Sequence, residues 1–446
     1  MEILIKASQF LLSLSLLIVL HELGHFIPAK LFKTRVEKFY LFFDYKFSLL
    51  KKKIGGTEYG IGWIPLGGYV KISGMIDESM DTEQLKEPAK SWEFRSKPAW
   101  QRLIIMLGGI FVNFILGFAL YILILFTWGE SYISNENLEG GIWVTNSLGT
   151  ELGLQTGDQI KTIDGKPIKA FSSIATELIN GNEFILEREG QKIAKQIPVD
   201  FIAKLIEEGK GAFISPRYPF VVGQISESSL NIKSGLQSKD MIVAINNRPV
   251  KYFDQAEMFL SALKNQEVSL SVKRGKKDIE IPVKLDENGK IGIGLGTLSN
   301  KDMERLGYYT LETKTYSFGE AIPAGIEKGY STLTGYLKQL KKVFNPETGA
   351  YKGLGGFISI GSIFPSTWSW QVFWSITAFL SIMLAVMNLL PIPALDGGHV
   401  VFTLYEMITG KKPSDKFLEY AQITGFVLLM ALLLFANAND IIKLFD

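Results

Sequence analysis

Four long apolar stretches stand out along the chain, at approximately residues 4–26, 102–128, 368–392 and 418–437. A helix needs roughly 20 apolar residues to cross a bilayer core of about 30 Å, and each stretch is that long. The pattern therefore predicts a polytopic α-helical membrane protein with about four transmembrane helices. We do not expect the first stretch to be a removable signal peptide, because no small-residue cleavage site follows it.

The loops between the apolar stretches differ in their lysine and arginine content. Residues 30–101 are rich in lysine, and the short loop between the last two stretches carries Lys411, Lys412 and Lys416. Because cytoplasmic loops carry an excess of Lys and Arg, both loops are predicted to be cytoplasmic. The same rule places both termini and the long region 130–367 on the opposite side of the membrane.

A second pattern, typical of β-structure, occupies residues 55–74. Tyr59, Ile61 and Trp63 alternate with glycines, a turn sequence follows at 65–68, and 69–72 is again apolar. This alternation predicts a β-hairpin. It could be an ordinary interfacial hairpin, or an edge strand that dips toward membrane depth, where strand backbone is tolerated only if it lines a cavity.

Residues 130–300 are soluble in composition and contain an internal repeat. Residues 153–168 (GLQTGDQIKTIDGKPI) align without gaps to 235–250 (GLQSKDMIVAINNRPV), with the same residue at seven of sixteen positions. A repeat of this size favours two tandem β-rich domains. Each copy resembles the PDZ domain, whose Gly-Leu-x-x-Gly-Asp turn precedes a strand, although Lys239 replaces the second glycine in the second copy. The resemblance implies binding of extended peptides or C-terminal carboxylates; two packing modules without a ligand are the alternative.

Composition adds little about partners but constrains metal chemistry. The 446 residues carry a net charge of +2, so nothing indicates a nucleic-acid partner and none is expected. The chain has no cysteine and only three histidines. Any transition-metal site must therefore be built from histidine and carboxylate ligands.

Two of the three histidines lie in the first apolar stretch, in the sequence His21-Glu22-Leu23-Gly24-His25. Histidines at i and i+4 share one face of a helix and can bind one Zn²⁺, with the intervening glutamate beside the metal's open position. Glu22 is the only acidic residue between Ala7 and Ala29. A carboxylate at bilayer depth is costly, and a role as general base would explain it.

A catalytic zinc normally has a third protein ligand. Asp396 is one candidate, because it follows Pro391 and Pro393, which must break the third apolar helix and create a polar cavity. His399 is the other candidate, although it could equally be a residue at the start of a helix near the cytoplasmic surface. The position of Asp396 at the end of the broken apolar run favours it, and the family resemblance described next adds to this preference.

The chain resembles the site-2 protease family over essentially its whole length, most closely the bacterial members with tandem PDZ domains. The resemblance rests on HELGH in the first span, Gly109-x-x-x-Asn113 in the second and Asn388-x-x-Pro-x-Pro-x-x-Asp396-Gly in the third. It implies an intramembrane zinc metalloendopeptidase with His21, His25 and Asp396 as zinc ligands. It also implies Glu22 as the catalytic base, Asn388 as a group that stabilises the oxyanion or orients substrate, and a membrane-associated β-element that pairs with substrate.

The resemblance further implies a multi-pass protein of the bacterial inner membrane with its PDZ domains outside the cytoplasm. Its partners would be the lipid bilayer and single-span membrane proteins, such as an anti-sigma factor or signal-peptide remnants. A membrane PDZ scaffold or chaperone with a structural metal, and a different zincin with a glutamate ligand, are the alternatives.

The predicted division is a first transmembrane helix (1–29), a cytoplasmic loop (30–101) with the hairpin (55–74), a second transmembrane helix (102–129), PDZ-like domains (130–212 and 213–300), an interfacial helix and Gly-rich segment (301–367), a third transmembrane helix (368–400), and a loop with the fourth (401–446).

Overall fold

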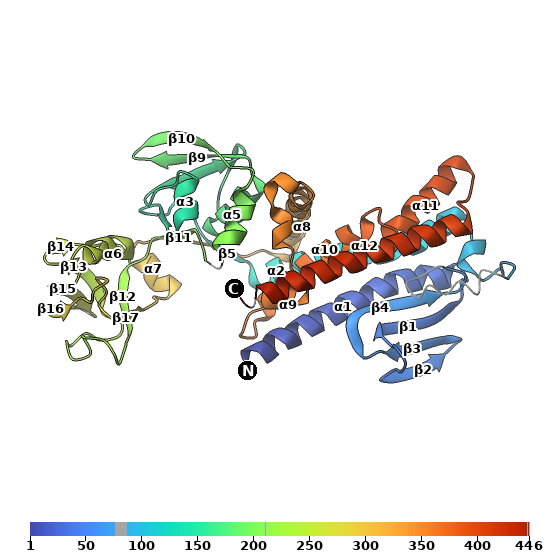
Figure 1. Ribbon diagram of the computed structural model, residues 1–446, viewed down its shortest axis with the longest axis horizontal. Coiled ribbons are helices and arrows are strands. Elements are labelled where there is room, and N and C mark those ends of the chain that lie inside the picture. The colour runs from blue at the N-terminus through green and yellow to red at the C-terminus, as the bar shows by residue number, and fades with distance from the viewer. Residues whose placement is uncertain (76–86, 210, 444, 446) are drawn as a thin grey trace. The chain divides into compact units, whose positions relative to one another are not determined.

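The computed structural model describes residues 1–75, 87–209, 211–443 and 445. It divides into two compact units (Figure 1). The membrane unit comprises residues 1–129, 315–344 and 351–446, and the β-rich unit comprises residues 130–314 and 345–350. All of the candidate site residues belong to the membrane unit.

Four described helices of the membrane unit are long and apolar enough to cross a membrane. They are α1 (Glu2–Leu31), α2 (Ala99–Trp128), α10 (Trp370–Leu389) and α12 (Asp415–Ile442). The prediction of a membrane protein with about four such helices is thus confirmed at this level. The unit also contains α8 (Phe318–Val343), α9 (Phe357–Ser362), α11 (Asp396–Thr409) and the short 3-10 helices Phe94–Ser96 and Ala350–Gly353.

Helices α1 and α2 approach each other closely where both carry glycine. A Cβ atom on Gly24 would lie 2.5 Å from the carbonyl oxygen of Gly108 and 2.7 Å from the Cα of Gly109. Small residues at a helix interface allow such backbone contact, which is a main source of helix association in membranes. The contact brings α2 against the part of α1 that carries the two histidines.

The third apolar segment is broken. Helix α10 ends at Leu389, well before residue 400, and α11 begins at Asp396. Pro391 and Pro393 lie between them, and proline has no N–H with which to continue a helix. A Cβ on Gly398 would lie 2.7 Å from the Ile392 carbonyl oxygen, so glycine is required where the break folds back on the start of α11.

The hairpin predicted at 55–74 is wrong in its pairing. The strands are β1 (Val36–Phe43), β2 (Leu50–Ile54), β3 (Thr57–Ile61) and β4 (Ile64–Ile72), in the sheet order β2-β3-β1-β4. Strand β1 lies between β3 and β4, parallel to the first and antiparallel to the second. The chain reaches β4 by passing over the end of β1, where the Gly62 N–H donates to Leu41 and a Cβ would collide with the Phe43 backbone.

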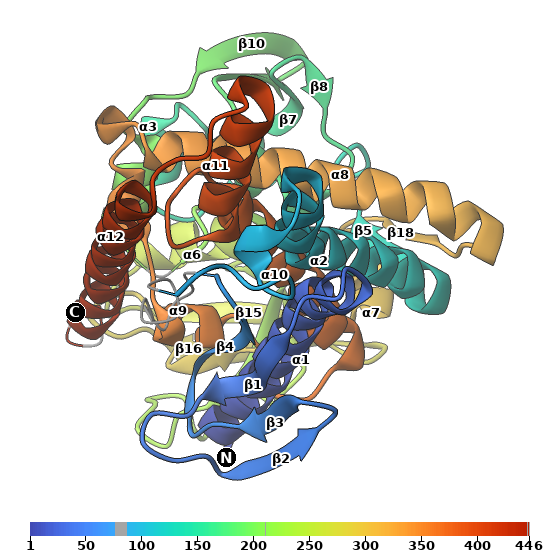
Figure 2. The ribbon, with the colours of Figure 1, turned by 90° about the vertical axis from the view of Figure 1, so that its right-hand side faces the viewer.

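The physical reason for the error is that alternation identifies strands but not their partners, and β1 lies between β3 and β4 in the sheet. The hairpin that does form joins β2 and β3 around Gly55-Gly56. Among the described residues, strand β4 pairs with β1 alone, which places it at the edge of the sheet. Figures 1 and 2 show this sheet beside α1.

The β-rich unit contains the internal repeat as two sheets of similar order. In the first, β7 (Gln159–Ile163) pairs with β8 (Lys166–Pro167) and with the β9–β10 hairpin (Glu183–Arg188 and Gln191–Gln196). In the second, β13 (Met241–Ile245) pairs with β14 (Arg248–Pro249) and with the β15–β16 hairpin (Glu267–Arg274 and Lys277–Lys284). The remaining elements are β5 (Glu130–Ile133), β6 (Ile142–Val144), α3 (Ser147–Glu151), the 3-10 helix Phe171–Ser173, α4 (Ile174–Asn180), α5 (Phe201–Glu208), β11 (Ile214–Pro216), β12 (Phe220–Ile225), α6 (Phe253–Ser261), β17 (Ile293–Leu295), α7 (Asn300–Arg305), β18 (Leu311–Lys314) and the 3-10 helix Pro346–Thr348.

Each copy of the repeat also contains the same ion pair. Arg188 donates from Nε and an Nη to the two carboxylate oxygens of Asp158, each at 2.7 Å, and Arg274 does the same to Asp240. Burial alone would raise the pKa of Asp240, but the hydrogen bonds from Arg274 hold it below its usual value. Each aspartate is the last residue of the Gly-Leu-x-x-x-Asp turn in its copy. The two copies of the repeat therefore share the same bidentate ion pair at the same position.

Candidate metal centre

The two histidines of α1 lie one turn apart on the same face of a continuous helix. The imidazole Nε2 atoms of His21 and His25 are 3.2 Å apart, and the rings meet edge to face at 82°. Helical spacing alone explains this geometry, since residues i and i+4 are neighbours on a helix surface.

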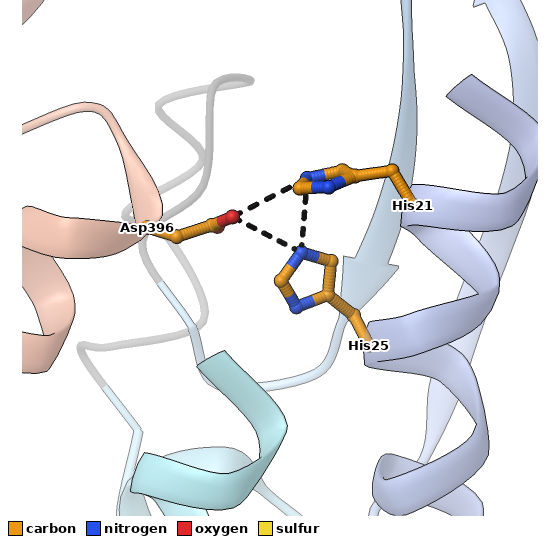
Figure 3. A group of neighbouring side chains, drawn as sticks. All are labelled: His21, His25 and Asp396. Carbon is orange, nitrogen blue, oxygen red and sulfur yellow. Dashed lines mark hydrogen bonds and ion pairs between the residues drawn. The ribbon is translucent and has the colours of Figure 1, made fainter. Parts of the chain in front are cut away.

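Asp396 reaches the same point from the first turn of α11. Its Oδ2 atom lies 3.3 Å from Nε2 of His21 and 3.3 Å from Nε2 of His25 (Figure 3). The break between α10 and α11 directs this carboxylate toward α1. The structure therefore brings together the three residues that the sequence nominated as ligands.

The donor set fits a zinc ion. In a tetrahedral site with ligand distances of about 2.0–2.1 Å, any two ligand atoms lie about 3.3 Å apart, which matches all three sides of the triangle. Among the described residues, His21, His25 and Asp396 form a group whose ligand atoms could share one ion. No described hydrogen-bond donor satisfies the buried Asp396 Oδ2. The other candidate, His399, does not belong to this group.

Other groups in α2 hold the two imidazole rings. His25 Nδ1 lies 2.7 Å from the Ile105 carbonyl oxygen, and His21 Nδ1 lies 3.2 Å from the Asn113 amide. A hydrogen bond at Nδ1 leaves Nε2 free as a ligand atom and fixes the ring orientation. A Cβ on Gly109 would overlap the ring atoms of both histidines, so a glycine there leaves room for the rings.

Asn113 therefore has a more specific position than the sequence suggested. A buried asparagine in an apolar helix usually forms a hydrogen bond between helices. Here the Asn113 side chain contacts His21 itself, and its Oδ1 has no hydrogen-bond partner among the described residues. If the amide is turned so that Oδ1 faces His21 Nδ1, Asn113 accepts the ring N–H and leaves His21 Nε2 available to bind a metal.

Glu22 and Asn388 lie beside the triad. Glu22 lines the same cavity as the two histidines and faces the backbone of Val70 on edge strand β4. Asn388, in the last turn of α10, places its Nδ2 atom 3.4 Å from Nε2 of His21. Both side chains are thus within reach of a group bound at the triad.

These residues open onto a cavity of ≈ 490 Å³. Its walls come from α1, the sheet and the start of α11, with Lys38, Asp44 and Tyr69 on the sheet side. The Tyr69 hydroxyl donates to Asp44 Oδ1 at 2.8 Å, and Lys38 Nζ lies 3.3 Å from Asp44 Oδ2. Burial alone would raise the pKa of Asp44, but these two partners hold it below its usual value.

Sequence reasoning missed the contacts that hold α11 in place. Arg102 of α2 pairs with Glu406 of α11 at 2.5 Å, and the Gln422 side chain accepts a hydrogen bond from the Ala394 N–H at 3.1 Å. A Cβ on Gly425 would overlap the Pro393 backbone, so α12 also touches the break. The only sequence signal was an arginine at the start of an apolar helix, which needs a partner when it is buried.

Comparisons with known proteins agree on the type of site. The model of the family described as Peptidase family M50 matches residues 9–432. The regulator of sigma E protease of Haemophilus influenzae is 28% identical over 473 residues, covering 100% of both chains. A candidate zinc metalloprotease of Campylobacter jejuni is 30% identical and covers 97% of this chain and 92% of its own. The regulator of sigma-E protease RseP of Escherichia coli is 28% identical, covering 98% of both.

Proposed function

The chain belongs to peptidase family M50 and is a zinc metalloprotease embedded in a membrane, and from this premise we propose that it is an intramembrane endopeptidase. Its substrates would be single-span membrane proteins, cut within the transmembrane segment. The observation that carries the proposal is the meeting of His21, His25 and Asp396 in one cavity. The two histidines of this cavity lie in α1, a helix long and apolar enough to span a bilayer.

In this proposal the imidazoles of His21 and His25 and the carboxylate of Asp396 hold the zinc ion. When bound, zinc supplies Lewis acidity and lowers the pKa of a coordinated water. Asn113 and the Ile105 carbonyl keep both rings oriented for this role. We assign these ligands on the fit of the 3.2–3.3 Å triangle to tetrahedral geometry.

Glu22 is proposed as the general base. It is the acid next to both histidines, and its carboxylate takes a proton from the attacking water and can return it to the leaving amine. Asn388 is proposed to donate its side-chain N–H to the carbonyl oxygen as negative charge develops there. Loss of one such donor typically costs about 100- to 1000-fold in kcat.

Strand β4 would hold the substrate. The carbonyls of a transmembrane helix are hydrogen-bonded within the helix, so the segment must unwind before attack. An unpaired peptide group in hydrocarbon is costly, and the edge of β4 that faces away from β1 would offer replacement hydrogen bonds. The position of Val70 beside Glu22 supports this arrangement, since a strand added there would run past the catalytic carboxylate.

Water would enter from the cytoplasmic side, where the lysine-rich loops are predicted to lie. The β-rich domains would then lie on the extracytoplasmic face of a bacterial inner membrane. We propose that they are PDZ-like filters that exclude substrates with large outer domains, so that cleavage follows an earlier trimming step. Deletion of residues 138–300 should allow cleavage of untrimmed substrates; if rejection is unchanged, the filter proposal fails.

The test of the catalytic proposal is cleavage of a tagged single-span substrate by purified protein, comparing wild type with Glu22→Gln and measuring zinc in both. We expect Glu22→Gln to retain zinc and to lose cleavage within the span. The matched control is Glu2→Gln, which removes the exposed acid at the other end of the same helix. If Glu22→Gln cleaves normally, Glu22 is not the base; if wild type carries zinc but cuts no single-span substrate, a membrane scaffold with a structural metal is favoured.

A further inference from the structure

The sheet of the membrane unit has a second edge, far from β4 in the strand order, with an unusual surface. This edge is β2. Large exposed apolar side chains lie on β2, in the loop before it and at the β3–β4 connection. Their exposed fractions range from 44% for Trp63 to 66% for Leu50. We call this surface the β2 patch; its apolar members are Tyr45, Phe47, Leu49, Leu50, Ile54 and Trp63.

The β2 patch is also strongly cationic. Lys46, Lys51, Lys52 and Lys53 are all exposed, and the chain has no acidic residue from 45 to 57. Within the described part of the chain, none of these four lysines forms an ion pair. Unpaired positive charge is thus concentrated on the strand that carries the exposed apolar side chains.

The patch has a defined structure. Phe47 stacks on Trp63 with ring centroids 5.6 Å apart, and the Trp63 indole N–H donates to the Tyr45 carbonyl oxygen at 2.8 Å. Strand β2 is paired along its full length with β3: Leu50 lies opposite Ile61 at one end, and Ile54 lies opposite Thr57 at the other. The aromatic rings and the lysines are therefore held on a folded sheet.

We propose that the β2 patch docks on the anionic headgroups of the bilayer in which the helices reside. Tyr and Trp side chains and the stems of lysines favour the membrane–water interface, and lysines are attracted to anionic lipid. The sheet is placed for this contact, because β1 begins five residues after α1, a candidate membrane span, ends at Leu31. A hydrophobic edge strand exposed to water would otherwise be prone to self-association.

The consequence concerns the orientation of the whole sheet. Strand β4 lines the catalytic cavity at one edge, and β2 would rest on lipid at the other. Docking would fix the angle at which β4 faces the cavity. The lipid contact itself does not depend on the protein being a protease.

The test is lysine labelling of the full-length protein in nanodiscs of phosphatidylcholine alone or with phosphatidylglycerol, read by mass spectrometry. We expect phosphatidylglycerol to slow modification of Lys51, Lys52 and Lys53 by about fivefold. High salt should restore the rate, because exposed charges are screened. The exposed Lys264, Lys276 and Lys277 of the β-rich unit are internal controls and should not respond.

A matched pair of variants completes the test. Lys51→Gln/Lys52→Gln/Lys53→Gln should abolish the protection that phosphatidylglycerol gives to Lys46, whereas Lys264→Gln/Lys276→Gln/Lys277→Gln should leave it intact. Equal labelling rates in the two lipids would overturn the proposal. Protection that appears in detergent without lipid and grows with protein concentration would also overturn it, because β2 would then be pairing with a second copy of the chain.

Discussion

The candidate metal centre is assembled from two regions that are built in different ways. The α1 region supplies two candidate ligands from one uninterrupted helix, and helical spacing sets the distance between them. The α10–α11 region supplies the third candidate, Asp396, from the first residue after a break. Its position depends on Arg102, Gln422 and the glycines that pack against the break.

The difference shows where geometry is local and where it is not. The separation of His21 and His25 follows from the helix and needs no other part of the chain. The position of Asp396 requires correct packing of α2, α11 and α12 around the break. We therefore expect the α1 region to tolerate changes in its surroundings better than the α10–α11 region does.

The largest effect is expected from removing a ligand of either region. Asp396→Ala and His25→Ala should each lower zinc affinity by more than about 100-fold, the upper end of what loss of an outer partner costs. Zinc content and cleavage should fall together. His399→Ala is the matched control and should retain zinc; loss of zinc in His399→Ala with retention in Asp396→Ala would identify His399 as the third ligand.

The next effect should be specific to the α10–α11 region. Arg102→Met alone leaves Glu406, whose side chain is 20% exposed, without its partner, and the cost should lie at or below the value of about 3–5 kcal/mol typical of a fully buried pair. We expect reduced thermal stability and weaker zinc binding in each single variant. The double variant Arg102→Met/Glu406→Leu should be less damaged than either single variant, because no charge is left unpaired.

The exposed pair Arg305–Asp302 offers a control for these charge changes. Removing both of its charges should change stability by less than about 1 kcal/mol. If Arg102→Met/Glu406→Leu is as unstable as the single variants, the Arg102–Glu406 ion pair contributes more to stability than the mutual neutralisation of its two charges.

A smaller effect should separate the two regions directly. Asn113→Leu removes the contact to His21, and Gln422→Leu removes the acceptor for the Ala394 N–H. Each should weaken zinc binding by about tenfold, as loss of an outer-shell partner usually does. Because the α10–α11 region depends on its surroundings, we expect Gln422→Leu also to broaden the thermal unfolding transition, whereas Asn113→Leu should not. The reverse result would contradict the contrast between the α1 region and the α10–α11 region.

The smallest effect concerns the sheet that follows α1. Because the pKa of Asp44 is lowered by Tyr69 and Lys38, its interactions stabilise the fold above its unfolded pKa of about 3.9. That contribution is lost as pH falls through the lowered value. Asp44→Asn should cost at most about 1 kcal/mol at pH 7 and should unfold with less dependence on pH between 5 and 3, with unchanged zinc content.

The sequence predicted those features whose geometry is local. Four apolar stretches gave the membrane helices, and the spacing of His21 and His25 gave two neighbouring imidazoles. The strand pairing at 57–72 was wrong because alternation identifies strands but not their partners, and β1 lies inserted between two strands that are adjacent in sequence. The Arg102–Glu406 contact joins two helices far apart in the chain, so no local pattern could reveal it.

The three candidate ligands also come from parts of the polypeptide that are made at different times. Asp396 follows His21 by 375 residues in the sequence, so it leaves the ribosome much later. A product that ends before Asp396 thus carries the HELGH sequence without the carboxylate that completes the candidate donor set. We expect such fragments to accumulate in the membrane without gaining hydrolase activity.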